Sequence, residues 1–232
     1  MKKINRLISG YNHNPGSISR IKYIVIHYVG ALGGAKENCQ YYAGGNRNAS
    51  AHYFVGFDGE IWQSVEDANI AWHCGASSYK HGECRNANSI GIELCVRKRN
   101  TASMGATDKD WYFEDATVEA AAELTRYLMD KYNVPASHVI RHYDVTGKIC
   151  PNPYVYNTTA HTWDEFKKKI SGAVAPAIKK LYRVRKSWKD AASQLGAFEE
   201  LENAKKACKV GYTVYDWNGK AVYPKTSQSK PD

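Results

Sequence analysis

Long hydrophobic runs are missing from this sequence of 232 residues. A membrane-spanning helix needs roughly 18 or more consecutive apolar residues, and no window approaches that length, so we expect no membrane span. The first residues, MKKINRLISGYNHNPG, carry positive charge. They lack the apolar segment of about 7–15 residues and the small-residue cleavage site of a secretory signal. They therefore predict synthesis in the cytoplasm without a signal peptide.

Closely spaced cysteine pairs are also missing. The six cysteines are irregularly spaced and none forms a CxxC motif, which in a cytosolic product disfavours a disulfide framework and predicts mostly buried thiols. One pair stays open. Cys74 and Cys84 bracket the stretch GASSYKHGE, and outside the cell they could form a disulfide.

Acidic residues are scarce relative to basic ones. Thirty-two Lys and Arg against 23 Asp and Glu give a net charge of +9, which favours polyanionic surroundings such as nucleic acid, anionic lipid or anionic wall polymers. No nucleic-acid-binding motif accompanies the charge, so charge alone selects none of these partners. The 43% hydrophobic and 12% aromatic content is ample for a packed core.

Strand and helix patterns alternate along the first 170 residues. Asp58-Gly59 is a strong hairpin signal between two of the strands, Thr117 is placed to cap the long helix, and Thr162 with Glu165 forms a capping box for the last one. The predicted strands are 21–27, 51–57, 60–65, 89–96 and 138–143, and the predicted helices are 35–42, 117–132 and one that begins near 162. This alternation predicts an α/β domain with a mixed sheet.

A second region follows the stretch ISGAVAPAIKK at 170–180. A strand near 181–188, a helix near 198–209 and a hairpin turning at Asn218-Gly219 predict a small βαββ module. We therefore expect a catalytic domain at 1–172, a linker at 173–180 and a small α+β module at 181–232.

The segment VIRHYDVTGKICP, residues 139–151, concentrates reactive side chains. It contains His142, Asp144, Lys148 and Cys150, and His27 ends an earlier predicted strand. Imidazole and thiolate suit zinc, and three protein ligands leave a fourth position open, as in catalytic zinc sites. The spacing alone is weak evidence, because a single His or Cys is usually buried or solvated and Asp144 fits a turn.

Five short motifs occur in a fixed order: IVIH, SAHYFV, AWHCG, NSIGIE and RHYDVTGKICP. In this order they resemble the zinc-dependent N-acetylmuramoyl-L-alanine amidases of type 2, the family of many phage endolysins and of the peptidoglycan recognition proteins. The resemblance covers about residues 15–170. It implies an α/β fold in which helices flank a mixed central β-sheet.

The resemblance also implies a reaction and a site. The reaction is hydrolysis of the amide between the lactyl group of N-acetylmuramic acid and L-alanine of the stem peptide. His27, His142 and Cys150 would bind one Zn²⁺, Glu93 would act as the general base, and Lys148 would stabilise the oxyanion.

Two further histidines lie inside the family motifs. We expect His52 and His73 to line the substrate cleft, with simple packing as the alternative. Some members of the family have a catalytic tyrosine directly before the second motif's histidine, where this chain has Ala51. That departure puts more weight on Glu93 and leaves Tyr53 as a core residue.

Aromatic side chains outside these roles have a simpler interpretation. Trp62 and Trp72 are predicted to be core residues. His13, His81, His138 and His161 have no motif around them and receive no role.

The C-terminal region carries most of the excess charge. From residue 175 onwards, twelve Lys and Arg minus six Asp and Glu give +6 of the total +9. The region faintly resembles sporulation-related repeats and small wall-anchoring modules of Gram-positive hydrolases. The resemblance implies a wall-binding module for peptidoglycan or anionic wall polymers, with a solvated accessory domain or a dimerisation unit as the alternative.

Together these features predict a phage or prophage endolysin. It would be made in the host cytoplasm and act on bacterial peptidoglycan after release, while a bacterial origin and the oligomeric state stay open. One rival is a peptidoglycan receptor without catalysis, but such relatives typically lose the cysteine ligand that Cys150 supplies here. The other rival, a nucleic-acid-binding protein, rests on charge alone.

Overall fold

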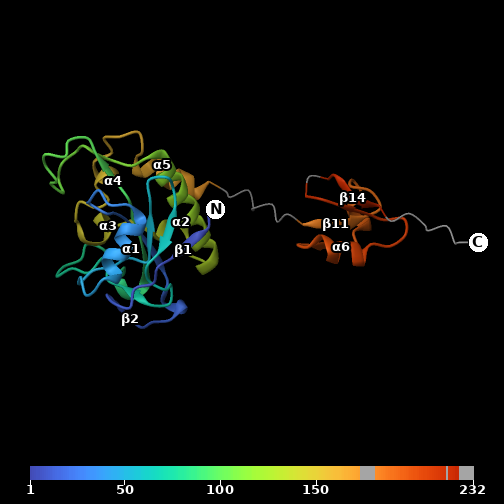
Figure 1. Cartoon of the computed structure of the whole chain (residues 1–232), viewed down its shortest axis with the longest axis horizontal. Coiled ribbons are helices and arrows are strands. Elements are labelled where there is room, and N and C mark those ends of the chain that lie inside the picture. The colour runs from blue at the N-terminus through green and yellow to red at the C-terminus, as the bar shows by residue number, and fades with distance from the viewer. Residues whose placement is uncertain (173–180, 218, 225–232) are drawn as a thin grey trace, which may run out of the picture. The chain divides into compact units, whose positions relative to one another are not determined.

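The computed structural model describes residues 1–172, 181–217 and 219–224. The chain divides into two compact units, Met1–Gly172 and Ala173–Asp232. Figure 1 shows the elements of both units. The predicted linker at 173–180 and the turn residue Asn218 lie outside the described residues.

A six-stranded mixed sheet forms the centre of the first unit. Its order is β1-β5-β4-β7-β3-β10, and every neighbouring pair is parallel except β4 and β5. The mixed α/β architecture predicted from the sequence is confirmed. Its strands are β1 (Ile4–Arg6), β3 (Tyr23–Tyr28), β4 (Tyr53–Val55), β5 (Ile61–Gln63), β7 (Ser89–Leu94) and β10 (Val139–Arg141). Two small pairs are added: β2 (His13–Asn14) with β6 (Ile70–Ala71), and β8 (Arg97–Lys98) with β9 (Trp111–Tyr112).

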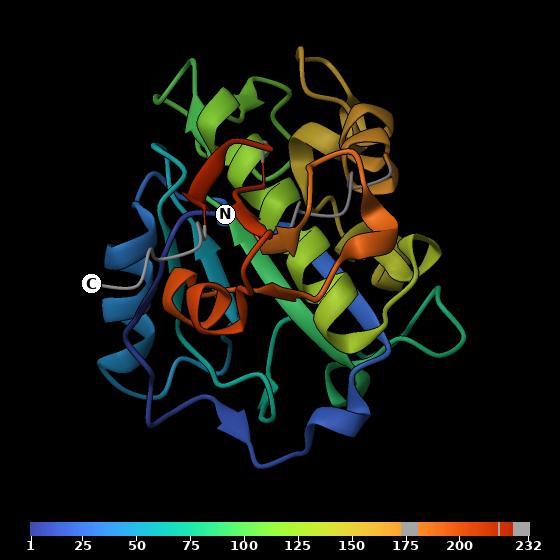
Figure 2. The same cartoon turned by 90° about the vertical axis from the view of Figure 1, so that its right-hand side faces the viewer.

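Helices pack on both faces of this sheet. Figure 1 shows α1 and α2 on opposite sides of the strands, and in Figure 2 α2 lies across them. The α-helices of the unit are α1 (Ala35–Ala43), α2 (Asp115–Tyr132), α3 (His142–Thr146), α4 (Asn152–Tyr156) and α5 (Trp163–Ser171). Three 3-10 turns each precede a strand of the central sheet: η1 (Ile18–Arg20) before β3, η2 (Asn86–Asn88) before β7 and η3 (Ala136–His138) before β10.

The alternation of side chains along β3 and β7 divides the sheet into two faces. Ile24 and Ile26 of β3 and Ile90 and Ile92 of β7 join the largest hydrophobic cluster, together with the buried face of α2. Successive side chains of a strand point to opposite faces. The intervening residues, which include His27 and Glu93, therefore lie on the face away from α2.

Most local predictions agree with the structure. The Asp58-Gly59 turn joins antiparallel β4 and β5, and Gly59 has φ +73°, a left-handed conformation that glycine adopts without steric cost. Thr162 accepts a hydrogen bond from the backbone of Glu165 and caps α5. The predicted helix at 117–132 is present in α2, whose buried residues include Val118, Ala121, Leu124 and Leu128.

Two local predictions are wrong. Helix α2 begins at Asp115 with Glu114 as its N-cap, so Thr117 is an internal helical residue. Its hydroxyl donates to the carbonyl of Gly56 at 2.9 Å instead. The predicted strand at 138–143 ends at Arg141, and His142 begins α3.

In its described residues, the second unit is a four-stranded antiparallel sheet with one α-helix. Its order is β12-β11-β13-β14. The elements are β11 (Tyr182–Arg185), η4 (Ala191–Ser193), β12 (Gly196–Phe198), α6 (Leu201–Ala207), β13 (Thr213–Tyr215) and β14 (Ala221–Pro224). Val184 and Val214 pack with Ala204 and Cys208 of the α6 region in a small core. The expected α+β character holds, but β12 was not predicted: residues 196 and 197 lay in no predicted element, and Phe198 was assigned to the helix.

All six cysteines are buried, as the irregular spacing predicts, and Cys74 and Cys84 are not joined by a disulfide. Cys74 and Cys84 lie in one small cluster with Tyr23, Val25 and Val145. Within the described part of the chain, no helix is long and apolar enough to cross a membrane.

Candidate metal centre and active-site cleft

The parallel pairing of β3 with β7 places two predicted site residues side by side. His27 is the register partner of Glu93, and the His27 Nδ1 atom lies 3.9 Å from Glu93 Oε1. Both strands belong to the buried middle of the sheet, so both side chains leave a rigid backbone. An imidazole and a carboxylate therefore face the same volume.

Two further residues reach this volume from the segment after β10. His142 is the first residue of α3, and Gly147 ends that helix in a left-handed conformation. The chain then folds back on the helix, because the backbone of Tyr143 donates to the carbonyl of Cys150 at 2.7 Å. This return brings Cys150 close to His142. Cys150 is not part of a strand, whereas His27 is the last residue but one of β3.

Asp144 holds this segment in shape. Its Oδ2 atom accepts hydrogen bonds from the backbone and side chain of Arg141 at 2.9 and 3.0 Å. Arg141 also donates to the carbonyl of Tyr154 in α4 at 2.9 Å. Asp144 therefore caps α3 from within the helix and orients it, rather than forming the turn that the sequence suggested.

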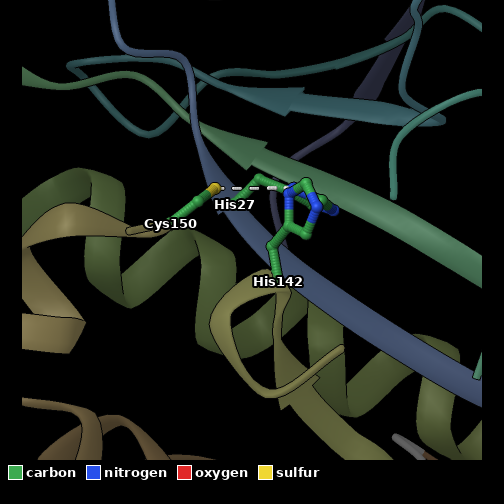
Figure 3. Close-up of side chains that lie close together, drawn as sticks. All are labelled: His27, His142 and Cys150. Carbon is green, nitrogen blue, oxygen red and sulfur yellow. Dashed lines mark hydrogen bonds between the residues drawn. The ribbon is translucent and has the colours of Figure 1, made fainter. Parts of the chain in front are cut away.

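His27, His142 and Cys150 converge, as Figure 3 shows. One ligand atom from each lies within 4.8 Å of the others, and all three residues are buried. The His27 Nδ1 and Cys150 Sγ atoms are 3.6 Å apart. A tetrahedral centre with Zn–N of about 2.1 Å and Zn–S of about 2.3 Å separates such a pair by about 3.6 Å.

An unpaired polar atom adds to this fit. His142 Nδ1 is buried and has no hydrogen-bond partner among the described residues. Buried polar groups are normally paired, so this nitrogen is available to a ligand. Two imidazoles and a thiolate are donors that suit zinc, and the residues present therefore fit a zinc ion.

Burial controls the charge of the three predicted ligands. It lowers the pKa of His27 well below its ordinary value, and the nearby His142 adds to the shift. Burial lowers the pKa of His142 to about 3, with Lys148 as the next cause. Both imidazoles are therefore neutral at pH 7, the form that binds a metal. Burial also raises the pKa of the Cys150 thiol, so thiolate formation depends on a cation.

Glu93 has the most perturbed carboxyl of the cleft. Burial raises its pKa to about 8, and the charge of Lys148 opposes the shift. Its Oε2 atom is buried and has no hydrogen-bond partner among the described residues. A carboxyl whose pKa lies near neutrality is suited to accept and return a proton at physiological pH.

These residues open onto a cleft. Its deeper part, about 300 Å³, is lined by His27, Glu93, His142, Lys148 and Cys150 among others. A shallower part of about 480 Å³ shares His142, Lys148 and His73 with it and continues over Trp72 and Asn48. The structure thus brings all three predicted ligands and both predicted catalytic residues to one cleft.

The two remaining predicted site residues lie at different depths. His73 lines the cleft with an exposed fraction of 8%. His52 is 0% exposed and is not among the residues that line either part of the cleft. Its Nδ1 atom accepts from the backbone of Gly91 at 3.0 Å, and its Nε2 atom lies 3.1 Å from the carbonyl of Asn69. His52 thus packs behind the cleft wall.

Sequence reasoning missed one wall of the cleft. Trp72, predicted to be a core residue, is half-exposed and lines both parts of the cleft. Its indole nitrogen donates to Asn14 Oδ1 at 2.5 Å. Its position inside the AWHCG motif, next to His73, was the available signal. Trp62 does pack against a buried cluster with Phe54.

Comparisons with known sequences agree with this site. Residues 17–153 match the family model described as N-acetylmuramoyl-L-alanine amidase. The amidase CwlL of Bacillus licheniformis is 32% identical over 169 residues, which are 67% of this chain and 42% of that protein. The 1,6-anhydro-N-acetylmuramyl-L-alanine amidase AmpD of Escherichia coli is 35% identical over 124 residues, 53% of this chain and 58% of that protein. The chain thus spans about half the length of the curated relatives it matches.

Solved structures share the fold. A mutant endolysin from Bacillus subtilis superposes with a TM-score of 0.57 at 27% identity, covering 73% of this chain and 99% of that one. The catalytic domain of XlyA gives the same values. Residues 17–153, which match the family model, contain all five motifs and the cleft residues His27, Glu93, His142, Lys148 and Cys150. The chain therefore belongs to the N-acetylmuramoyl-L-alanine amidase family.

Proposed function

We propose that this protein is a zinc-dependent peptidoglycan hydrolase that cleaves the amide bond between N-acetylmuramic acid and L-alanine of the stem peptide. The observation that carries the proposal is the convergence of His27, His142 and Cys150 beside Glu93 and Lys148 in one cleft. Membership of the amidase family supports the bond class. Lysis of the bacterial wall, with release from the host cytoplasm beforehand, extends the same proposal.

The proposed roles follow from the chemistry of each side chain. His27, His142 and Cys150 hold the zinc ion. When bound, zinc lowers the pKa of a coordinated water towards about 7 and polarises a carbonyl. Glu93 takes a proton from the attacking water and returns it to the departing amine of L-alanine. Lys148 places a positive charge where the carbonyl oxygen becomes negative.

We also propose that the second unit binds the cell wall through one face of its sheet. Val184 points into the core, so Arg183 and Arg185 point to the face away from α6. They pair in register with Tyr215 and Thr213. The guanidinium of Arg185 also lies 5.2 Å from the centre of the Trp188 ring.

This face combines positive charge with aromatic rings. Trp188 packs against Tyr215 with ring centres 5.8 Å apart. Aromatic rings offer flat apolar surfaces for sugar rings, and arginines pair with phosphate or carboxylate groups. The combination fits an anionic glycopolymer of the wall.

The metal proposal predicts a specific outcome for Cys150→Ser. A neutral hydroxyl is a poorer zinc ligand than a thiolate, so the variant should lose zinc and amidase activity. The cleft walls change little in volume, so binding of a non-cleavable muramyl peptide should persist. Metal analysis and calorimetry measure the two properties. Cys39→Ser, an equally buried thiol in another cluster, is the control and should keep its zinc. Zinc and turnover that persist in Cys150→Ser would remove this residue from the ligand set.

Glu93→Gln and Lys148→Ala should keep the fold and the metal yet lose turnover. Loss of an acid–base group costs about 10²–10⁴-fold, and loss of an oxyanion-stabilising group about 10²–10³-fold. Release of soluble wall fragments by purified variants measures the effect. Lys80→Ala is the matched control for Lys148→Ala, since Lys80 is an exposed lysine that packs on the Tyr143 ring. Near wild-type turnover in Glu93→Gln would assign the base role to another residue.

The raised pKa of Glu93 predicts a pH-dependent stability for the metal-free protein. Its pKa is about 8 in the folded state against an ordinary 4.5. Between these values the folded state keeps a proton that the unfolded state releases, so the free energy of unfolding falls as pH rises across this window. The Glu93→Gln variant lacks this titrating group, so its free energy of unfolding should fall less as pH rises. Denaturant unfolding of both metal-free proteins at several pH values tests this, and equal pH slopes would contradict it.

The wall-binding proposal predicts that Arg183→Ala weakens sedimentation of the full-length protein with intact walls. Loss of one such charge should cost up to about 1 kcal/mol, roughly fivefold, and the difference should vanish near 1 M salt, where the Debye length is about 3 Å. Lys206→Ala is the control, because this substitution removes the same charge from α6, which packs on the other side of the sheet. Equal wall binding by both variants would exclude this face.

A further inference from the structure

A chain of buried hydrogen bonds runs away from the metal centre. His27 Nε2, the ring nitrogen that faces away from Cys150, lies 3.0 Å from His73 Nδ1. His73 Nε2 lies 3.1 Å from the hydroxyl of Ser89, which donates to the carbonyl of Arg85 at 2.6 Å. His27 and Ser89 are 1% and 0% exposed. Because His27 and Ser89 are shielded from water, each needs a partner within the protein, and His73, which also borders the cleft, supplies one to both.

The carbonyl at the far end determines the direction of every bond. Arg85 O can only accept, so the single proton of the Ser89 hydroxyl is committed to it. Ser89 Oγ must then accept from His73, which places the His73 proton on Nε2. His73 Nδ1 is left bare and accepts from His27 Nε2–H. His27 Nδ1 therefore carries no proton.

This is the nitrogen that faces the metal centre. His27 Nδ1 lies 3.6 Å from Cys150 Sγ, and only a bare ring nitrogen can coordinate a metal. In the reversed chain, His27 Nδ1 would carry the proton and Ser89 would give up its 2.6 Å bond to Arg85. The hydrogen bond from Ser89 to the carbonyl of Arg85, in which His27 takes no part, thus favours the His27 tautomer whose Nδ1 can bind a metal.

We propose that Ser89 and His73 are positioning residues that hold His27 in the Nε2–H tautomer before the metal arrives. Groups that bond the second nitrogen of a ligating histidine fix its tautomer and ring orientation. The AWHCG and NSIGIE motifs then serve the same metal ligand, although neither supplies a ligand itself. This inference rests on the proposed zinc site.

The test reads the tautomer directly in metal-free protein. Two-bond ¹H–¹⁵N correlation spectra of histidine-labelled protein distinguish Nε2–H from Nδ1–H imidazole. Wild type should show His27 as Nε2–H. Ser89→Ala removes the acceptor at little steric cost, and it should shift His27 towards Nδ1–H or a mixture of both tautomers.

Zinc affinity provides a second readout by competition with a chelator. Ser89→Ala and His73→Leu should bind zinc about 10–100-fold more weakly, the usual cost of losing such a partner. His73→Asn keeps an acceptor oxygen near the place of Nδ1 and should restore both the tautomer and most of the affinity. Ser64→Ala is the matched control, since Ser64 is equally buried and makes no hydrogen bond to either histidine.

A folded Ser89→Ala protein whose His27 stays fully Nε2–H would overturn the inference. So would a zinc dissociation constant within twofold of wild type, or a His73→Asn variant no better than His73→Leu. Failure of the proposed function looks different. If wild type binds no zinc, the metal site is wrong, whereas the tautomer spectra still report on the hydrogen-bond chain.

Discussion

The parallel register between β3 and β7 is the constraint on which the rest of the site depends. It sets His27 directly beside Glu93 and Val25 beside Gly91, on the face turned away from α2. A shift of one residue along either strand would exchange this polar set for isoleucines. The isoleucines of the other face, held under α2, prevent that exchange, so the hydrophobic core also determines the geometry of the cleft.

Burial controls the protonation of three side chains at this face of the sheet. It keeps both imidazoles uncharged and keeps a proton on Glu93 near neutral pH. The site therefore holds few negative charges until a cation enters, although its donors are already close together. A cation reverses this balance by favouring the Cys150 thiolate and the Glu93 carboxylate. Charge develops only where the ion can compensate it.

The family motifs divide into residues that face the cleft and residues that support them. His27, Glu93, His142, Lys148 and Cys150 form the first group. His52 belongs to the second group, since its ring accepts a hydrogen bond from the backbone of β7 at Gly91. Asp144 supports α3 in a similar way through Arg141. The geometry of the cleft thus depends on polar contacts one layer deeper in the protein.

The sequence by itself determined the local elements. β-branched runs and the Asp58-Gly59 turn report their own conformation, because each depends on neighbours a few residues away. The five motifs, through the family that they resemble, predicted a site formed by His27, His142 and Cys150, and these residues do converge. The sequence did not determine how deeply individual side chains are buried. Thr117 looked like a helix cap, Trp72 like a core residue and His52 like a cleft residue. The actual place of each depends on strand register and on which face of the sheet a helix covers. Those are contacts between residues far apart in the chain, and only the tertiary structure decides them.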